Sequence, residues 1–135
     1  MITDNYIKMC EKSEDLQKEW KPELGDKASW NGRIFNIDNI NFEPIKRIYV
    51  YLPSQEQLQE MILPVLKKKY NKHWNLVKMD RQANWIFRIF NCFLNEHSGI
   101  YSNDMNELWL AFVMKEKYNK IWTKNSWKEI KGGDI

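Results

Sequence analysis

The chain has 135 residues and a formal net charge of +3, and 43% of its residues are hydrophobic. This length suits one domain with a sizeable core, and the composition excludes wholesale disorder. Because 21 basic residues stand against 18 acidic ones, the charge excludes a DNA-mimicking inhibitor and gives little support to nucleic-acid binding.

The first predicted element is a helix over residues 4–19. Its apolar residues recur at three- and four-residue steps, as on the buried face of an amphipathic helix, and charged residues occupy the other face. Thr3 or Asp4 offers the side-chain oxygen of an N-cap. Pro22 pushes Lys21 out of the helical conformation, so we expect one continuous helix that ends before this proline.

A small antiparallel meander is predicted next. Asn31-Gly32 separates two strand-like runs, 27–30 and 33–37, and this dipeptide is typical of a type I′ hairpin turn because both central residues need positive φ. Residues 45–52 are rich in β-branched and aromatic side chains and predict the third strand of the meander.

Several agreeing signals predict a second helix from Ser54 onward. Ser54 and Gln57 have the spacing of a capping box, in which each side chain bonds the backbone N–H of the other residue. Pro64 removes one backbone donor, so we expect this helix to kink or end there. The lysines at 67–69 follow, where cations suit a helix C-terminus.

Two further helices are predicted in the second half of the chain. One covers residues 81–95 and carries Trp85 on its apolar face, and the other covers residues 103–119 and carries Trp109. The second is so apolar that we expect it to be the central packing element of the domain. Between the helices, residues 70–79 fit either a strand or an early helical turn.

The C-terminal part predicts a β-hairpin, with one strand over residues 120–123 and the other beginning at Ser126. We expect residues 129–135 to form a frayed tail. The predicted fold is therefore a single α+β domain over residues 1–135, in which three main helices pack on a small antiparallel meander and a β-hairpin ends the chain.

Three blocks of sequence also resemble a known family. These are LPSQEQLQEM (52–61), LWLAFVMKEKYNKIW (108–122) and the W-K-P and G-D pattern within residues 20–26. They are similar to segments of short accessory proteins encoded by phages and prophages of low-GC Gram-positive bacteria. The resemblance implies no catalytic residues. It implies an accessory phage gene, a setting in which proteins that blunt host immunity are common.

A search for catalytic signatures is negative. No P-loop, dinucleotide fingerprint, HExxH motif, CxxC pair or nucleophile elbow is present. The run at 96–98 holds a carboxylate, an imidazole and a hydroxyl, but neighbours in sequence rarely point at one another. A metal site would need His73, His97 and both cysteines to converge from separate elements. We therefore expect no enzyme, no cofactor and no metal.

The location of the protein is predicted from what the chain lacks. It has no signal peptide and no apolar run long enough to span a bilayer. Cys10 and Cys92 have no paired spacing and are typical of buried thiols in a reducing compartment. We expect a protein of the host bacterial cytoplasm with no membrane contact.

Aromatic residues reach 14%, and rings in this number need a thick core or exposed faces that stack on a ligand. If Arg47, Tyr49 and Tyr51 share one strand face, they form a platform for a base and a phosphate, and an ordinary sheet surface is the alternative. The basic stretch near residue 70 is either an anion site or a solvated helix end. The candidate ligand-binding residues are Trp30, Arg33, Arg47, Tyr49, Tyr51, Lys69 and Trp74.

From these residues we predict a non-catalytic protein that sequesters a nucleotide-like small molecule. The sequestration would counter a host defence. The alternative is an inhibitor, of the anti-CRISPR type, that docks on a host defence protein through Trp20, Trp122 and Trp127, which we expect to be half exposed. Weak nucleic-acid binding ranks third. Two copies sharing one pocket, as a homodimer, would also fit exposed hairpin rings.

Overall fold

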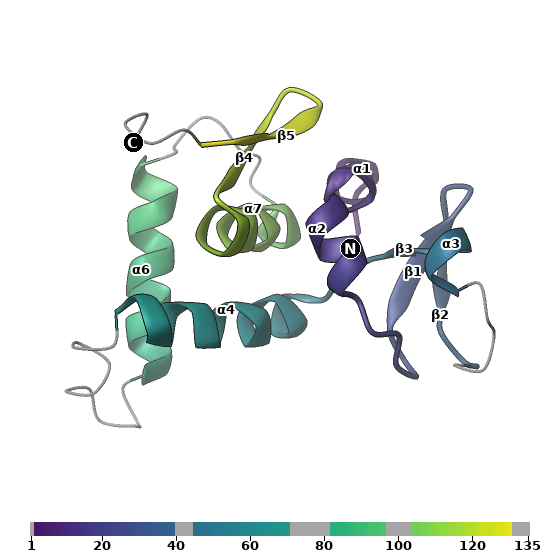
Figure 1. Cartoon of the computed structure of the whole chain (residues 1–135), viewed down its shortest axis with the longest axis horizontal. Coiled ribbons are helices and arrows are strands. Elements are labelled where there is room, and N and C mark those ends of the chain that lie inside the picture. Colours follow the sequence, from purple (N-terminus) through teal and green to yellow (C-terminus); the bar gives the residue numbers. More distant parts are fainter. Residues whose placement is uncertain (1, 40–44, 71–81, 97–103, 131–135) are drawn as a thin grey trace.

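Helix α7, Met105–Tyr118, lies at the centre of the molecule, as the sequence predicts (Figure 1). The computed structural model describes residues 2–39, 45–70, 82–96 and 104–130. The buried residues of α7 are Glu107, Trp109, Leu110, Ala111, Phe112, Val113 and Met114. The N-cap is Asp104, whose carboxylate accepts the backbone N–H of Glu107 at 3.0 Å.

Helices α1 (Asp4–Lys12), α4 (Gln55–Lys69) and α6 (Gln82–Glu96) and strand β4 (Lys120–Thr123) all pack against α7 (Figure 1). Rings fill the space between α6 and α7. Trp109 stacks on Phe90 with centroids 3.9 Å apart, and Phe112 meets Phe90 edge-on at 5.4 Å. Some of the many aromatic side chains of this sequence are therefore buried in the core. The side chain of Trp85 lies outside the described part of the chain.

The predicted first helix is wrong in one respect, because it is two helices that meet at a buried serine. After α1, the hydroxyl and the backbone N–H of Ser13 both donate to the carbonyl oxygen of Cys10, at 2.6 Å and 3.1 Å. This local bonding competes with the helical pattern. Helix α2, Glu14–Glu19, then starts in a new direction and leads to Trp20.

Helix α4 begins with the predicted capping box. The Ser54 hydroxyl accepts the backbone N–H of Gln57 at 3.1 Å, and the Gln57 side chain accepts the backbone N–H of Ser54 at 2.9 Å. The helix does not end at Pro64 but continues to Lys69. Its buried residues are Leu58, Ile62 and Leu66, which face α7.

The small sheet has the order β2-β1-β3, with β1 (Lys27–Trp30) in the middle and antiparallel to β2 (Arg33–Asn36) and β3 (Val50–Tyr51). Asn31 (φ 52°) and Gly32 (φ 77°) form the predicted turn, since both have positive φ. The third strand thus pairs with the first strand, whereas a simple meander would pair it with the second.

The strand predicted over residues 45–52 is mostly wrong. Its first half is the helical turn α3, Ile45–Ile48, closed by a bond from the Tyr49 N–H to the Ile45 carbonyl oxygen at 2.9 Å. Ile45 is buried in the core. A helical turn can bury this isoleucine as well as a strand can, so the apolar and β-branched residues of this stretch did not require a strand. Only β3 keeps the extended form.

The C-terminal hairpin is confirmed. Strand β4 pairs with β5, Ser126–Glu129, and Trp122 lies opposite Trp127. Asn119, in the left-handed conformation with φ 57°, joins α7 to β4. The tail predicted from residue 129 is wrong at its start, because the N–H of Ile130 donates to the Asn119 carbonyl oxygen at 2.8 Å. The last five residues of the chain lie outside the description.

Together these elements form a single α+β domain with a small antiparallel sheet and a terminal hairpin. Along the described residues, no helix has the length and apolar character to cross a membrane.

Candidate functional site

One face of the small sheet carries a row of exposed rings. Trp30 pairs with Arg33, and Ala28 pairs with both Phe35 and Tyr51. Because side chains alternate along a strand, these residues lie on the same face of the sheet. Trp30 is 48% exposed and Phe35 is 36% exposed.

The rings of this row touch one another. The centroids of Trp30 and Phe35 are 6.4 Å apart, and Tyr49 meets Phe35 edge-on at 5.9 Å. Tyr49 comes just before β3 and is half-buried. We call Trp30, Arg33, Phe35 and Tyr49 the aromatic face. Three of these residues, Trp30, Arg33 and Tyr49, are candidates from the sequence, and Phe35 extends the row.

The aromatic face is bordered by a hollow of about 370 Å³, whose lining includes Phe35, Tyr49 and Ile45. The guanidinium of Arg33 is exposed and forms no ion pair with a described residue. Arg47, the second candidate cation, belongs to helix α3, and the position of its side chain is not among those that the structure describes. A flat ring system with an attached anion could stack on the rings and reach Arg33.

The Tyr51 end of the same sheet face is covered. The ring of Tyr51 stacks on Trp20 with centroids 4.9 Å apart and planes within 1° of parallel. Both residues are only 4% exposed. Tyr51 is therefore no part of an open platform, and the prediction that Trp20 is half exposed is wrong. Trp20 is buried because it has two partners, the Tyr51 ring and the Asp26 carboxylate, which accepts its indole N–H at 3.0 Å.

The other candidates are not brought to the aromatic face. Lys69 lies at the end of α4 and pairs with Glu116 on α7 at 2.5 Å. It lines a separate hollow of about 790 Å³ between α4, α6, α7 and the terminal hairpin. Trp74, like His73 and His97, lies outside the described residues.

The hairpin tryptophans serve internal packing instead of an open surface. Trp122 is buried, with 6% of it exposed, so the prediction of a half-exposed ring is wrong there. Trp127 is half-buried as predicted, but it packs on Trp122 at 5.0 Å and donates its indole N–H to the Met9 carbonyl oxygen at 2.9 Å. These contacts tie the hairpin to α1.

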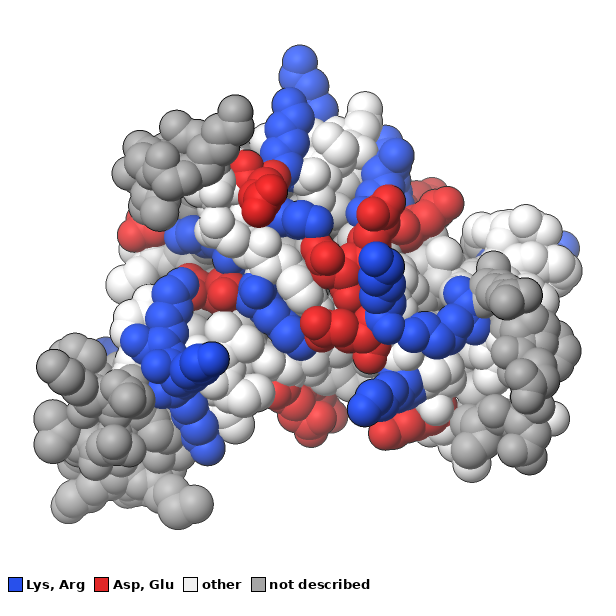
Figure 2. Space-filling view, viewed as in Figure 1, with Lys and Arg blue, Asp and Glu red and all other residues white. Residues whose placement is uncertain are grey.

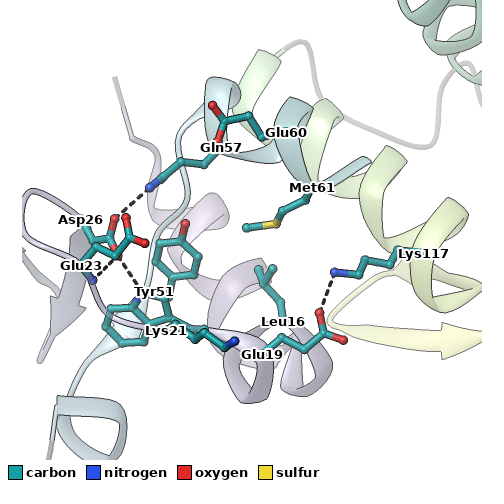
Figure 3. A pocket seen from close by; sticks show the side chains of 11 residues that line it. Leu16, Glu19, Lys21, Glu23, Asp26, Tyr51, Gln57, Glu60, Met61 and Lys117 are labelled. Carbon is teal, nitrogen blue, oxygen red and sulfur yellow. Dashed lines mark hydrogen bonds and ion pairs between the residues drawn. The ribbon is translucent and has the colours of Figure 1, made fainter. Parts of the chain in front are cut away.

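A third hollow, which sequence reasoning missed, lies between α2, the following loop, β3 and α4. We call it the α2–α4 pocket, and its volume is about 310 Å³ (Figure 3). The described residues that line it are Leu16, Glu19, Trp20, Lys21, Glu23, Asp26, Tyr51, Gln57, Glu60, Met61 and Lys117. They come from α2, the loop after it, β3, α4 and α7, and the local signals visible in the sequence were the Gly25-Asp26 turn and the capping box that includes Gln57.

Asp26 organises the wall of this pocket. Besides the Trp20 indole, its carboxylate accepts the backbone N–H of Glu23 at 2.9 Å and the side-chain amide of Gln57 at 2.8 Å (Figure 3). Gly25, with φ 91°, supplies the positive φ that lets the loop turn into β1. One carboxylate thus joins the loop, α2 and the capping box of α4.

Charges on the face of the molecule drawn in Figure 2 are mixed. Figure 2 shows basic and acidic side chains interleaved over one face, with no broad area of a single sign. Among the described residues, no group of three or more His, Cys, Asp or Glu side chains is placed to hold a metal ion. Cys10 is buried and Cys92 is exposed, so the expectation of two buried thiols is wrong for Cys92.

Comparison with protein-family models, with curated proteins and with solved structures gives no match for this chain.

Proposed function

We propose that the chain is a non-catalytic binding protein that holds a nucleotide-like small molecule on the aromatic face. The observation that carries this proposal is the contact row of Trp30, Phe35 and Tyr49 beside the guanidinium of Arg33, which forms no ion pair with a described residue. A base would stack on the rings, each such stack contributing about 1–3 kcal/mol. The guanidinium would bind a phosphate through paired N–H donors.

The geometry supports a ligand there because the rings are costly to leave in water. Large aromatic side chains on a monomer surface are normally scattered, whereas these are contiguous. The setting of counter-defence by sequestration rests on the resemblance to phage accessory proteins. In that setting a protein needs only to bind its ligand tightly, without turnover.

A protein partner is the second candidate, and strand β2 favours it. β2 lies at the edge of the sheet, and all four of its residues are exposed. An extended segment of a partner can add to such an edge through backbone hydrogen bonds. Ile34 is 45% exposed and lies on the sheet face opposite to the aromatic face, so it would contact such a partner but not a ligand stacked on the rings.

Calorimetric titration with cyclic nucleotides and ADP-ribose derivatives tests the first candidate. Trp30→Ala should weaken binding about tenfold, since one stacking contact is lost. Arg33→Gln should weaken binding of phosphorylated ligands and leave the matching nucleosides unaffected. Phe87→Ala is the matched control, because Phe87 is an equally exposed ring (46%) on α6.

Two results would count against the small-molecule proposal. One is the absence of any binder at micromolar concentrations, and the other is an equal loss in the Phe87 and Trp30 variants. Ile34→Lys separates the two candidates. It should abolish capture of a protein partner at the β2 edge, and it should leave nucleotide binding unchanged.

A further inference from the structure

The α2–α4 pocket has a charge opposite to that of the whole chain. The formal net charge of the protein is +3. The described residues lining the pocket include four carboxylates but only two lysines, so the local balance is negative. A phosphate is therefore disfavoured in this pocket, and a cation is favoured.

Two of the four carboxylates are already committed to protein partners. Glu19 accepts from the Lys117 ammonium at 2.6 Å and from the Tyr118 hydroxyl at 2.7 Å. Asp26 accepts the three N–H groups described above. The carboxylates of Glu23 and Glu60 form no ion pair or side-chain hydrogen bond with the described residues. These two groups are free to bind a ligand.

The hydroxyl of Tyr51 points into the cavity between Gln57 and Met61 (Figure 3). Tyr51 is 4% exposed, yet its hydroxyl has no hydrogen-bond partner in the described part of the chain, where only its backbone is bonded, to Gln17. Buried polar groups are almost always bonded, and leaving one unsatisfied costs about 1–3 kcal/mol. The pocket therefore contains a polar group placed for a partner that the chain does not supply.

The environment of this hydroxyl is acidic. Burial raises the pKa of Tyr51 well above its ordinary value, and the charges of Asp26, Glu23 and Glu60 raise it further. Tyr51 therefore stays protonated at neutral pH, with its oxygen lone pairs available to a donor. The negative charges that raise the pKa would also attract a cation to the same place.

We propose that the α2–α4 pocket binds a small alkylammonium ligand. The ammonium would donate to the Tyr51 hydroxyl and to the carboxylates of Glu23 and Glu60. Its methylene chain would lie against Leu16 and Met61, which give the pocket an apolar wall (Figure 3). The volume of about 310 Å³ is at the lower end for ligand sites and suits a molecule of this size.

The alkylammonium group could belong to a free amine or to a lysine side chain of another protein, and both have the same chemistry.

Lys21 is exposed on the side of the opening away from Glu60 (Figure 3). Its positive charge repels a cationic ligand and so weakens binding. The site shares no residue with the aromatic face, so the inference stands apart from the function proposed above.

Calorimetric titration of the full chain with butane-1,4-diamine, spermidine, Nα-acetyl-lysine amide and, as a neutral analogue, butan-1-ol tests this inference. The amines should bind and the alcohol should not. Tyr51→Phe and Glu60→Gln should each weaken amine binding about tenfold, because the first removes an acceptor of the ammonium and the second removes one of the negative charges that attract it. Lys21→Ala should strengthen binding, since it removes a like charge. A preference for the lysine amide over the free amines would identify the source as a side chain.

The controls separate binding from folding. Glu56→Gln, on the same helix as Glu60 but outside the pocket lining, should change nothing. Tyr51→Phe should not lower the melting temperature of the parent protein, because the hydroxyl bonds no described residue and its removal relieves the burial of an unsatisfied polar group. The inference is overturned if no amine binds at millimolar concentration, or if the Tyr51 and Glu60 variants bind amines as the parent does.

Discussion

Replacing Asp26 by alanine should be among the most destabilising single changes in this protein. The carboxylate is 6% exposed and accepts the indole N–H of Trp20, the backbone N–H of Glu23 and the amide of Gln57. Without it, a buried indole N–H loses its partner outright, while the other two donors can turn partly to water. A hydrogen bond to a charged group contributes about 1.5–3 kcal/mol, so the gross loss is about 3–5 kcal/mol.

One effect acts in the opposite direction. Asp26 has no cationic partner among the described residues, and burying such a charge is unfavourable, so its removal returns part of the loss. We expect a net decrease of about 3 kcal/mol in the free energy of unfolding, a large fraction for a domain of this size. Asp26→Asn should cost only about 1 kcal/mol, because one carbonyl oxygen can still accept from Trp20 and Glu23, which share Oδ2.

Urea unfolding followed by tryptophan fluorescence measures both changes, by linear extrapolation to water. Glu11→Ala, an exposed carboxylate on α1, is the control and should have little effect. The reasoning is refuted if Asp26→Ala costs no more than the Glu11 control, or if the alanine and asparagine variants are equally unstable.

Two further predictions concern titratable groups. In a Cys92→Ser variant, a thiol reagent should label nothing until urea unfolds the chain, because Cys10 is buried and burial raises its pKa; labelling of the native variant would contradict this. Burial raises the pKa of Glu19, but the hydrogen bonds from Lys117 and Tyr118 outweigh this effect and hold the pKa below its ordinary value. A carboxyl whose pKa is lowered by folding stabilises the fold above its unfolded-state pKa, and this stabilisation is lost as the pH falls through its folded-state pKa. Glu19→Gln should therefore make the free energy of unfolding fall less steeply between about pH 5 and 3, and an unchanged slope in urea unfolding at these pH values would contradict the prediction.

Signals confined to a few neighbouring residues were predictive. The Asn31-Gly32 turn depends on the φ angles of two residues, and the capping box on a spacing of three residues between Ser54 and Gln57. Distant parts of the chain have little opportunity to override such local chemistry. The central position of α7 was predictable for a related reason, since a helix apolar on nearly every side must be surrounded.

Features that depend on distant partners were not predictable. Residues 45–52 satisfy strand propensity, but Ile45 enters the core from a helical turn, and propensity cannot show that. Trp20 stands at a helix end, where a ring is often half exposed, and it is buried because Tyr51 stacks on it. Whether a ring at such a position is covered depends on residues about thirty positions away.

The candidate site divides in the same way. Trp30, Arg33 and Tyr49 were each predicted as candidate residues, but that Trp30 and Arg33 share one face follows only from the pairing of β1 with β2, and Tyr49 lies beside them. Their role in binding stays a prediction. The α2–α4 pocket was out of reach, because its walls meet only after Glu23 and Glu60 have been brought together by the fold.

The contact between α1 and the terminal hairpin has a consequence during translation. The Trp127 indole N–H donates to the carbonyl oxygen of Met9 on α1, and Lys120 at the start of the hairpin pairs with Asp15 on the neighbouring helix α2 at 2.5 Å. Helix α1 leaves the ribosome among the first elements of the domain, yet the strands that cover it are synthesised last. Until β5 has emerged from the ribosome, helix α1 therefore lacks the cover that the hairpin gives it in the folded domain.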